Sequence, residues 1–243
     1  MSVKSKKPDK SLWVPQREKI DFDLKIRDFP FTEKQRQFID LALKKETKVI
    51  FFDGPSGSSK TTLSVYVALQ MLKERKNGEI YYVRSVIESA DKSLGFLPGD
   101  SNDKFGPFAQ PLMDKLEELL PSGDIKRLIL ENRIKATPVN FMRGLSLYAT
   151  TLILDEAQNL SIKEIITVLT RIGKFSKFIF CGDHQQSDIN KKENGLQAMM
   201  KAFNDEDSRA NGIHCVHFGK EDIMRSELLR FIVQKLEDTK MVS

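Results

Sequence analysis

The sequence contains few of the residues that stabilise small secreted proteins or anchor chains in membranes. Of its 243 residues two are cysteine, Cys181 and Cys215, and both lie in apolar runs. A disulfide framework is typical of short, cysteine-rich chains, so we expect both thiols to be buried and reduced. No apolar run approaches the roughly 20 residues that span a bilayer. The first ten residues are too polar for a signal peptide, and we expect a cytoplasmic protein.

Aromatic and histidine residues that would indicate other kinds of site are sparse or badly spaced. The one tryptophan, Trp13, stands alone, and no basic motif interleaved with aromatic residues predicts RNA stacking. His214, Cys215 and His217 are close in the sequence, but side chains alternate along a strand, so they do not predict a common metal site. The net charge of +5 and the pI near 9.0 are modest evidence for a polyanionic partner.

The pattern of apolar segments predicts one α/β domain. Hydrophobic residues make up 40% of the chain, which is enough for a sizeable core. We expect residues 1–29 to form a basic, flexible tail and residues 30–243 to form the domain. Short apolar runs alternate with helical patterns, which favours a parallel sheet flanked by helices. The expected strands cover residues 49–53, 80–84, 151–155, 178–181 and 213–218.

Residues 85–145 are more than one strand and one helix require, and they contain several glycines and prolines. We expect a loop-rich insertion at the strand ends, where loops of nucleotide-binding folds commonly contact partners. Within it, Leu112, Leu116 and Leu119 share one helical face and predict a core contact. The basic residues of this region either line a nucleic-acid channel or form a solvated face, and the sequence leaves both open.

Residues 48–62, KVIFFDGPSGSSKTT, form the most informative segment of the chain. An apolar run leads into a glycine- and serine-rich turn that ends in Lys60 and Thr61, which is typical of a phosphate-binding loop followed by a helix. Lys60 would reach the β- and γ-phosphates, and the Thr61 hydroxyl would bind Mg²⁺. Ser59 stands where the motif has glycine, so a Cβ lies where the backbone approaches phosphate. The predicted nucleotide-binding residues in this loop are Gly54, Pro55, Ser56, Gly57, Ser58, Ser59, Lys60, Thr61 and Thr62.

Two further apolar runs end in the polar residues that phosphoryl transfer requires. Asp155 and Glu156 follow the run at residues 151–154. Asp155 can bind Mg²⁺, and Glu156 can activate a water molecule. Gln186 comes shortly after the run at residues 178–181, and it could sense the γ-phosphate or position that water. Ligands bind at strand ends in open α/β sheets, so the order of these motifs predicts one nucleotide site.

These motifs, with others between them, resemble the PhoH-like family of P-loop ATPases, which is similar to the first RecA-like domain of superfamily 1 helicases. The resemblance covers most of residues 30–235. It is carried by the stretches YVRSVIE (82–88), LGFLPGD (94–100), MRG (142–144), ILDEAQN (153–159), LTRIG (169–173) and GDHQQ (182–186). Departures are Ser59 for glycine, Ser85 where the family usually has proline, and Ser226 where it usually has histidine.

The resemblance implies a RecA-like P-loop NTPase in a single domain. It further implies ATP and Mg²⁺ as ligands, RNA or single-stranded DNA as a partner, and a homo-oligomer, with a hexameric ring as the expected form. Arg225 would act as an arginine finger from a neighbouring subunit, since this chain is too short to contain the second RecA-like domain that supplies the arginine in helicases. A surface arginine at the start of a helix is the alternative.

The resemblance also assigns a role to Gln35, which would read the edge of the adenine base. Gln35 lies three residues after Thr32, and together they form the pattern of a helix capping box. The two roles compete for one side-chain amide, which can both donate and accept. We favour the adenine contact.

The predicted function is Mg²⁺-dependent ATP hydrolysis, coupled to RNA or single-stranded DNA in a helicase-like or RNA-processing role. The alternative is a nucleotide-gated binding protein that scarcely hydrolyses ATP, which the departure at Ser59 suggests. A small-molecule kinase is a third candidate. Adjacent acidic residues favour water over such an acceptor, and no segment indicates an acceptor pocket.

Overall fold

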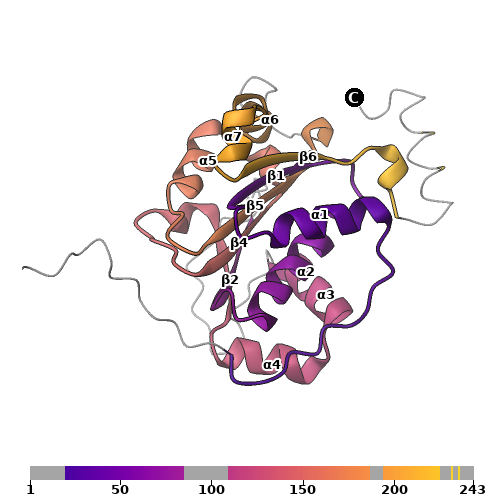
Figure 1. Cartoon of the computed structure of the whole chain (residues 1–243), viewed down its shortest axis with the longest axis vertical. Coiled ribbons are helices and arrows are strands. Elements are labelled where there is room, and N and C mark those ends of the chain that lie inside the picture. The colour runs from indigo at the N-terminus through magenta and orange to yellow at the C-terminus, as the bar shows by residue number, and fades with distance from the viewer. Residues whose placement is uncertain (1–19, 85–108, 187–193, 225–230, 232–234, 236–243) are drawn as a thin grey trace, which may run out of the picture.

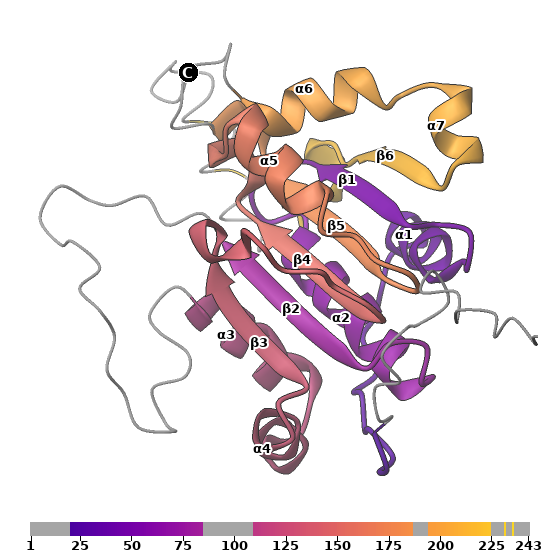
Figure 2. The ribbon, with the colours of Figure 1, turned by 90° about the vertical axis from the view of Figure 1, so that its left-hand side faces the viewer.

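The computed structural model of the chain describes residues 20–84, 109–186 and 194–224, together with Phe231 and Lys235. Its centre is a six-stranded sheet in the order β3-β2-β4-β5-β1-β6, in which each adjacent pair is parallel (Figure 2). The strands are β1 (Val49–Asp53), β2 (Glu79–Arg84), β3 (Ile134–Pro138), β4 (Thr150–Asp155), β5 (Lys177–Gly182) and β6 (Ile213–His217). The predicted α/β fold with a parallel sheet is confirmed.

Helices cover both faces of the sheet (Figure 1). One face carries α1 (Glu33–Leu43), α2 (Lys60–Lys73), α3 (Gln110–Leu119) and α4 (Ser122–Leu130). On or beside the other lie α5 (Ile162–Leu169), α6 (Gly195–Ala202) and α7 (Glu206–Ala210). The described 3₁₀ turns are η3 (Val139–Met142), η4 (Ala157–Asn159), η5 (His184–Gln186) and η6 (Lys220–Asp222). Successive side chains of β1 pack into the two layers in turn, with Phe52 on the α2 side and Phe51 on the α5 side.

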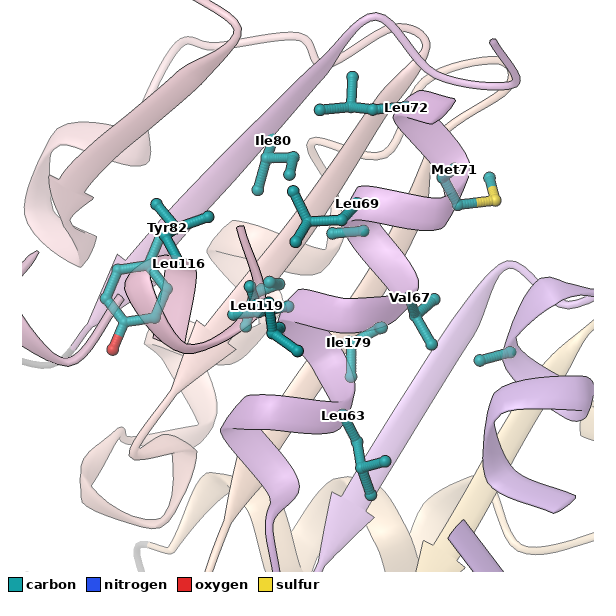
Figure 3. Close-up of a cluster of buried hydrophobic side chains, with 14 of the residues drawn as sticks. Leu63, Val67, Leu69, Met71, Leu72, Ile80, Tyr82, Leu116, Leu119 and Ile179 are labelled. Atoms are coloured by element: carbon teal, nitrogen blue, oxygen red, sulfur yellow. The ribbon is translucent and has the colours of Figure 1, made fainter. Parts of the chain in front are cut away.

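Helix α2 is anchored in the first of these layers by apolar side chains. Figure 3 shows Leu69 and Leu72 of α2 near Ile80 of β2, and Leu63, at the other end of the helix, near Ile179 of β5. Each of these three leucines is completely buried, and burying such a side chain stabilises the fold by roughly 1.5–3 kcal/mol. The N-terminus of α2 is therefore held in a fixed place at the carboxyl edge of the sheet.

The five predicted strands are all present, and their ends differ from the prediction by at most one residue. The central strands β1, β4 and β5 are buried along their whole length, as continuous apolar runs predict for a parallel sheet covered on both faces. The strand β3 was not predicted. It lies at the edge of the sheet, where Lys135, Thr137 and Pro138 are tolerated, so its apolar signal is weak.

The predicted loop-rich insertion at residues 85–145 is wrong for the part that the structure describes. Residues 109–145 form α3, α4, β3 and η3, which are regular elements. Leu112, Leu116 and Leu119 are completely buried, so the helical face predicted for them is confirmed. Residues 85–108 lie outside the described residues.

The predicted flexible tail is also wrong for residues 20–29. Ile20 and Leu24 are buried in the core. The Lys25 backbone N–H donates to Asp124 Oδ2 at 2.9 Å, and the Arg27 backbone N–H donates to the Leu119 carbonyl at 2.9 Å. These contacts tie the segment to α3 and α4, so the packed domain begins before residue 30. Residues 1–19 lie outside the described residues.

Two predictions drawn from scarce features can be compared with the fold. Cys181 is buried as predicted, whereas Cys215, on the edge strand β6, is only partly buried. That both thiols are reduced stays a prediction. In the part of the chain that the structure describes, no helix combines the length and apolar character needed to cross a membrane.

Candidate nucleotide-binding site

The turn between β1 and α2 has the close-packed backbone of a phosphate-binding loop. The Gly54 N–H donates to the Gly182 carbonyl at 3.2 Å, which joins the loop to the end of β5. A Cβ on Gly54 would lie 3.0 Å from the Phe218 Cβ, so a side chain there would push the loop outward. Gly57 has a φ of +86°, in the left-handed region that favours glycine. The loop shape therefore depends on both glycines.

Ser59 adopts a left-handed conformation just before α2, with φ 65° and ψ 20°. Ser59, which replaces the glycine of the motif, thus occupies a position whose backbone geometry favours glycine. For a residue with a Cβ this conformation costs roughly 1–2 kcal/mol. Its side chain makes no capping hydrogen bond to the helix, so nothing in the cap compensates for the strain.

Lys60 is held inside the loop by main-chain carbonyls. Its Nζ donates to the Gly54 carbonyl at 2.6 Å and to the Pro55 carbonyl at 2.9 Å. Burial lowers the pKa of this amine, and the negative charges of Asp183, Asp155 and other nearby groups partly oppose that shift. The loop therefore carries a partly buried amine at the place where phosphate oxygens would bind.

The phosphate loop and the acidic motif meet at Asp155. Thr61 Oγ1 donates to Asp155 Oδ1 at 3.1 Å, and the Tyr82 hydroxyl donates to Asp155 Oδ2 at 2.7 Å. Burial raises the pKa of Asp155, whereas the hydrogen bonds from Tyr82 and Thr61 act in the opposite direction. Burial and the adjacent Asp155 carboxylate raise the pKa of Tyr82 well above its ordinary range, so its hydroxyl stays a donor.

Glu156 lies one residue beyond β4 in a left-handed conformation, with φ 55°. Its Oε2 accepts a hydrogen bond from Gln158 Nε2 at 2.6 Å, and its Oε1 lies 3.6 Å from Arg84 Nη2. The change of backbone direction turns Glu156 away from the buried position of Asp155. Two adjacent acidic residues thus have different surroundings, one buried and one partly exposed.

A cavity of about 550 Å³ connects these groups, which is within the size range of small-molecule sites. The predicted residues that line it are Ser56, Gly57, Ser59, Lys60, Thr61, Thr62, Asp155, Glu156 and Gln186. Three other predicted residues, Gly54, Pro55 and Ser58, shape the loop instead. The Ser58 hydroxyl donates to the Pro55 carbonyl at 2.8 Å, and both other residues contact Lys60 through their carbonyls.

Gln35 forms the capping box and does not line the cavity. Its Oε1 accepts from the Thr32 N–H at 3.0 Å, and its own N–H donates to Thr32 Oγ1. The side chain is buried, and its acceptor oxygen is already used by the cap. The role that we did not favour is therefore the one that the structure shows. The adenine contact stays a prediction and would require the cap to open.

Arg225 lies outside the described residues. The residue before it, Met224, lines the cavity, and its N–H donates to the Gly57 carbonyl at 3.1 Å. Sequence reasoning missed this contact. It also missed Phe29, Pro30 and Tyr82, because each reaches the site through tertiary packing, and no local motif indicates such a contact.

Comparison with known proteins agrees with this geometry. The family model described as PhoH-like protein matches residues 29–237. The chain belongs to the PhoH-like protein family. The PhoH-like protein of Synechocystis sp. is 35% identical over 87% of this chain and 63% of its own length. The protein PhoH of Escherichia coli is 33% identical over 74% of this chain and 51% of its own length. This PhoH-like chain therefore spans about half to two thirds of those relatives.

Solved structures share the fold of this PhoH-like chain. The large terminase from a thermophilic bacteriophage matches with a TM-score of 0.53 over 86% of this chain and 50% of its own, at 12% identity. A structure of the same terminase in complex with ADP matches with a TM-score of 0.52 over 85% of this chain and 50% of its own, at 11% identity. Identities this low show the fold alone. The PhoH-like chain thus has a RecA-like P-loop NTPase fold.

Proposed function

We propose that this PhoH-like chain hydrolyses ATP with Mg²⁺. The observation that carries the proposal is the 3.1 Å hydrogen bond from Thr61 Oγ1 to Asp155 Oδ1, which joins the phosphate loop to the acidic motif. A hydroxyl and a carboxylate oxygen side by side are ligand types that Mg²⁺ prefers. Thr61 and Asp155 would hold the ion. When bound, it neutralises charge on the β- and γ-phosphate oxygens.

The remaining residues of the cavity have distinct roles in this proposal. Backbone N–H groups of the loop and the Lys60 amine bind the triphosphate. Gln186 orients a water molecule for attack on the γ-phosphorus, and the bond from that phosphorus to the bridging oxygen breaks. Glu156 takes the proton of the water, and Arg84 Nη2, 3.6 Å from its Oε1, helps to hold the carboxylate in place.

The adenine base of the nucleotide would lie against the wall of the cavity that the segment before α1 forms. Phe29 and Pro30 line that wall, and apolar side chains there can pack against a nucleobase. Neither residue discriminates between bases by hydrogen bonding, so the preference for ATP rests on the family resemblance.

We further propose that hydrolysis is coupled to RNA or single-stranded DNA and that the chain works as a homo-oligomer. The support is the family resemblance together with the net charge of +5, which favours polyanionic partners. In this proposal Arg225 reaches the site of a neighbouring subunit. Turnover should then fall on dilution, and stimulation by nucleic acid should weaken as salt rises.

A second candidate function is nucleotide-gated binding with little hydrolysis. The observation that favours it is the strained conformation of Ser59 beside a Lys60 amine that is held by carbonyls. Such a loop could bind ATP without aligning it for attack.

One experiment separates the two functions. ATP turnover is measured with Mg²⁺, with and without single-stranded RNA and DNA, for the wild type, Glu156→Gln and the surface control Glu117→Gln. We expect turnover in the wild type and the control, and a loss of at least about 100-fold in Glu156→Gln. If the wild type binds ATP but does not turn it over under any of these conditions, the hydrolase proposal is wrong and nucleotide-gated binding is favoured.

A further inference from the structure

Three metal-ligating side chains, Asp53, Asp183 and His184, meet at the ends of β1 and β5, and His217 at the end of β6 contacts one of them. Strands β1 and β6 are neighbours (Figure 2), and their last residues, Asp53 and His217, are paired in register. Asp53 Oδ2 lies 2.8 Å from His184 Nδ1 and 2.7 Å from His217 Nδ1. A carboxylate oxygen of Asp183, an oxygen of Asp53 and a ring nitrogen of His184 all lie within 4.8 Å of one another. The ends of β1 and β5 therefore direct two carboxylates and one imidazole to one place, and the His217 ring at the end of β6 contacts one of those carboxylates.

Two of these groups are carboxylates, and burying their negative charge lowers the stability of the folded state. Asp53 is 2% exposed and Asp183 is 6% exposed. Two buried anions this close repel each other, and the backbone N–H groups of His184 and Ser56, which donate to Asp53 and Asp183, offset part of that cost. Lys60 faces both, but its single charge also faces Asp155. The histidines add positive charge when they are protonated, and a bound cation would do so at any pH.

We propose that Asp53, Asp183, His184 and His217 form a second metal site, which binds a divalent cation of the zinc type. Imidazole nitrogens combined with carboxylate oxygens suit Zn²⁺, whereas Mg²⁺ prefers a shell of oxygen ligands. Zn²⁺ would bind the two Nδ1 atoms that now lie within hydrogen-bond distance of Asp53 Oδ2. The ring protons would then reside on Nε2, so each imidazole stays neutral.

Asp53, Asp183 and His184 already lie close together, whereas the His217 ring has to turn toward them to become the fourth ligand, since its centroid is 6.2 Å from that of His184. Ligand atoms of a tetrahedral zinc site lie roughly 3.3 Å apart, given metal–ligand bonds of about 2.0–2.1 Å. The distances from Asp53 Oδ2 to the two ring nitrogens are about half an ångström shorter than that. The side chains of His184 and His217 are 32% and 58% exposed, so both rings have room to move outward.

An open path leads to the cluster. A surface cavity of about 600 Å³ is lined by Asp53 and His184, together with side chains of α6 that include Gln197 and Lys201. It is distinct from the nucleotide cavity, which Asp183 lines. Asp183 Oδ2 accepts from the Ser56 N–H of the phosphate loop at 3.1 Å. A metal at this site would therefore lie directly beneath the loop.

Three histidines in the whole chain provide a matched set of variants. His184 and His217 are proposed ligands, whereas His214 is on the same strand as His217 but its side chain points to the opposite face. Zn²⁺ is titrated into the metal-stripped full chain without nucleotide or Mg²⁺, and binding and thermal stability are measured. We expect one tight site and a raised melting temperature. His184→Ala and His217→Ala should each weaken Zn²⁺ binding at least tenfold, and His214→Ala and Cys215→Ser should not.

A measurement on the wild type alone covers the case in which a variant fails to fold. Histidine carbethoxylation is mapped by mass spectrometry with and without Zn²⁺. Protection of His184 and His217, but not of His214, supports the site. The proposal is overturned if Zn²⁺ does not bind saturably, if His184→Ala and His217→Ala bind it as the wild type does, or if the two proposed ligands are not protected.

Discussion

Two lysines at opposite edges of the sheet, the partly buried Lys60 and the buried Lys177, are held in the same way and have different surroundings. Lys60, at the carboxyl edge, donates to the carbonyls of Gly54 and Pro55. Lys177, at the amino edge, donates to the carbonyls of Lys44 and Thr47 at 3.0 and 2.5 Å. In both, burial is the largest cause that lowers the pKa of the amine.

The difference lies in the charges that surround each amine. Lys60 faces the carboxylates of Asp183, Asp155 and Asp53, which favour its charged form. Burial is the main reason that the pKa of Lys177 falls to about 8; Lys76 also disfavours the charged form, and the single carboxylate of Glu46 opposes the shift. A neutral amine can still donate to two carbonyls, so Lys177 needs no charge to hold the turn that follows α1. Burial alone therefore does not indicate function, and the surrounding carboxylates do.

The largest effect should come from removing the Lys60 amine. We expect Lys60→Met to lower ATP affinity and turnover by at least about 100-fold, because the loop loses its cation for the phosphate oxygens. Lys177→Met is the matched control and should turn over ATP at the wild-type rate. Equal losses in the two variants would show that both act through stability.

The next effect concerns the pH dependence of stability through Lys177. Its folded-state pKa of about 8 is below its ordinary value of 10.5, so between these pH values the unfolded chain holds a proton that the folded chain has released. The free energy of unfolding that Lys177 contributes should therefore rise with pH over this window, by about 3 kcal/mol in total. Urea unfolding of the wild type and Lys177→Met at pH 7 and pH 10 measures it. A difference between the two proteins that does not change with pH would contradict the shift.

A smaller effect should follow from the loss of the Tyr82 hydroxyl. Tyr82→Phe removes a hydrogen bond that lowers the pKa of the buried Asp155 carboxyl, so ionised Asp155 becomes less favourable. We expect the Mg²⁺ concentration for half-maximal turnover to rise about 5- to 20-fold, from a loss of about 1–2 kcal/mol. Turnover at saturating Mg²⁺ should change much less. Tyr81→Phe, one residue away on the other face of the strand, should leave the Mg²⁺ requirement as it is.

The smallest effect concerns backbone strain at Ser59. Ser59→Gly should raise the free energy of unfolding by about 0.5–1 kcal/mol, because glycine adopts the left-handed conformation without a Cβ clash. Ser59→Ala keeps the Cβ and should give no such gain. Denaturant midpoints at unchanged slope measure both. A gain in the alanine variant equal to that in the glycine variant would point to the hydroxyl and away from strain.

The central strands and the phosphate loop could be predicted from sequence because their signals are local. The run from Val49 to Asp53 is apolar on both faces, as a strand covered by two helical layers must be. Thr61 and Asp155 were expected to meet because parallel strands end at one edge, and they lie 3.1 Å apart. The edge strand β3 has no such signal, since Lys135 and Pro138 are stable only because one side of the strand is open.

Contacts that depend on register could not be predicted in the same way. The Tyr82 hydroxyl reaches Asp155 because β2 and β4 are neighbours, which the sequence order does not indicate. His217 was compared with its sequence neighbours His214 and Cys215, although its partner is Asp53 on the adjacent strand. Gln35 had two plausible partners, and the local one, Thr32, is bonded in the structure.

The most direct test of the account is the Mg²⁺ dependence of ATP turnover in Asp155→Asn, with the exposed Asp40→Asn as control. If Asp155 and Thr61 hold the ion, Asp155→Asn should lose at least about 100-fold in turnover, and Asp40→Asn should match the wild type. An Asp155→Asn protein that turns over ATP at the wild-type rate, with the wild-type Mg²⁺ requirement, would contradict the proposed site.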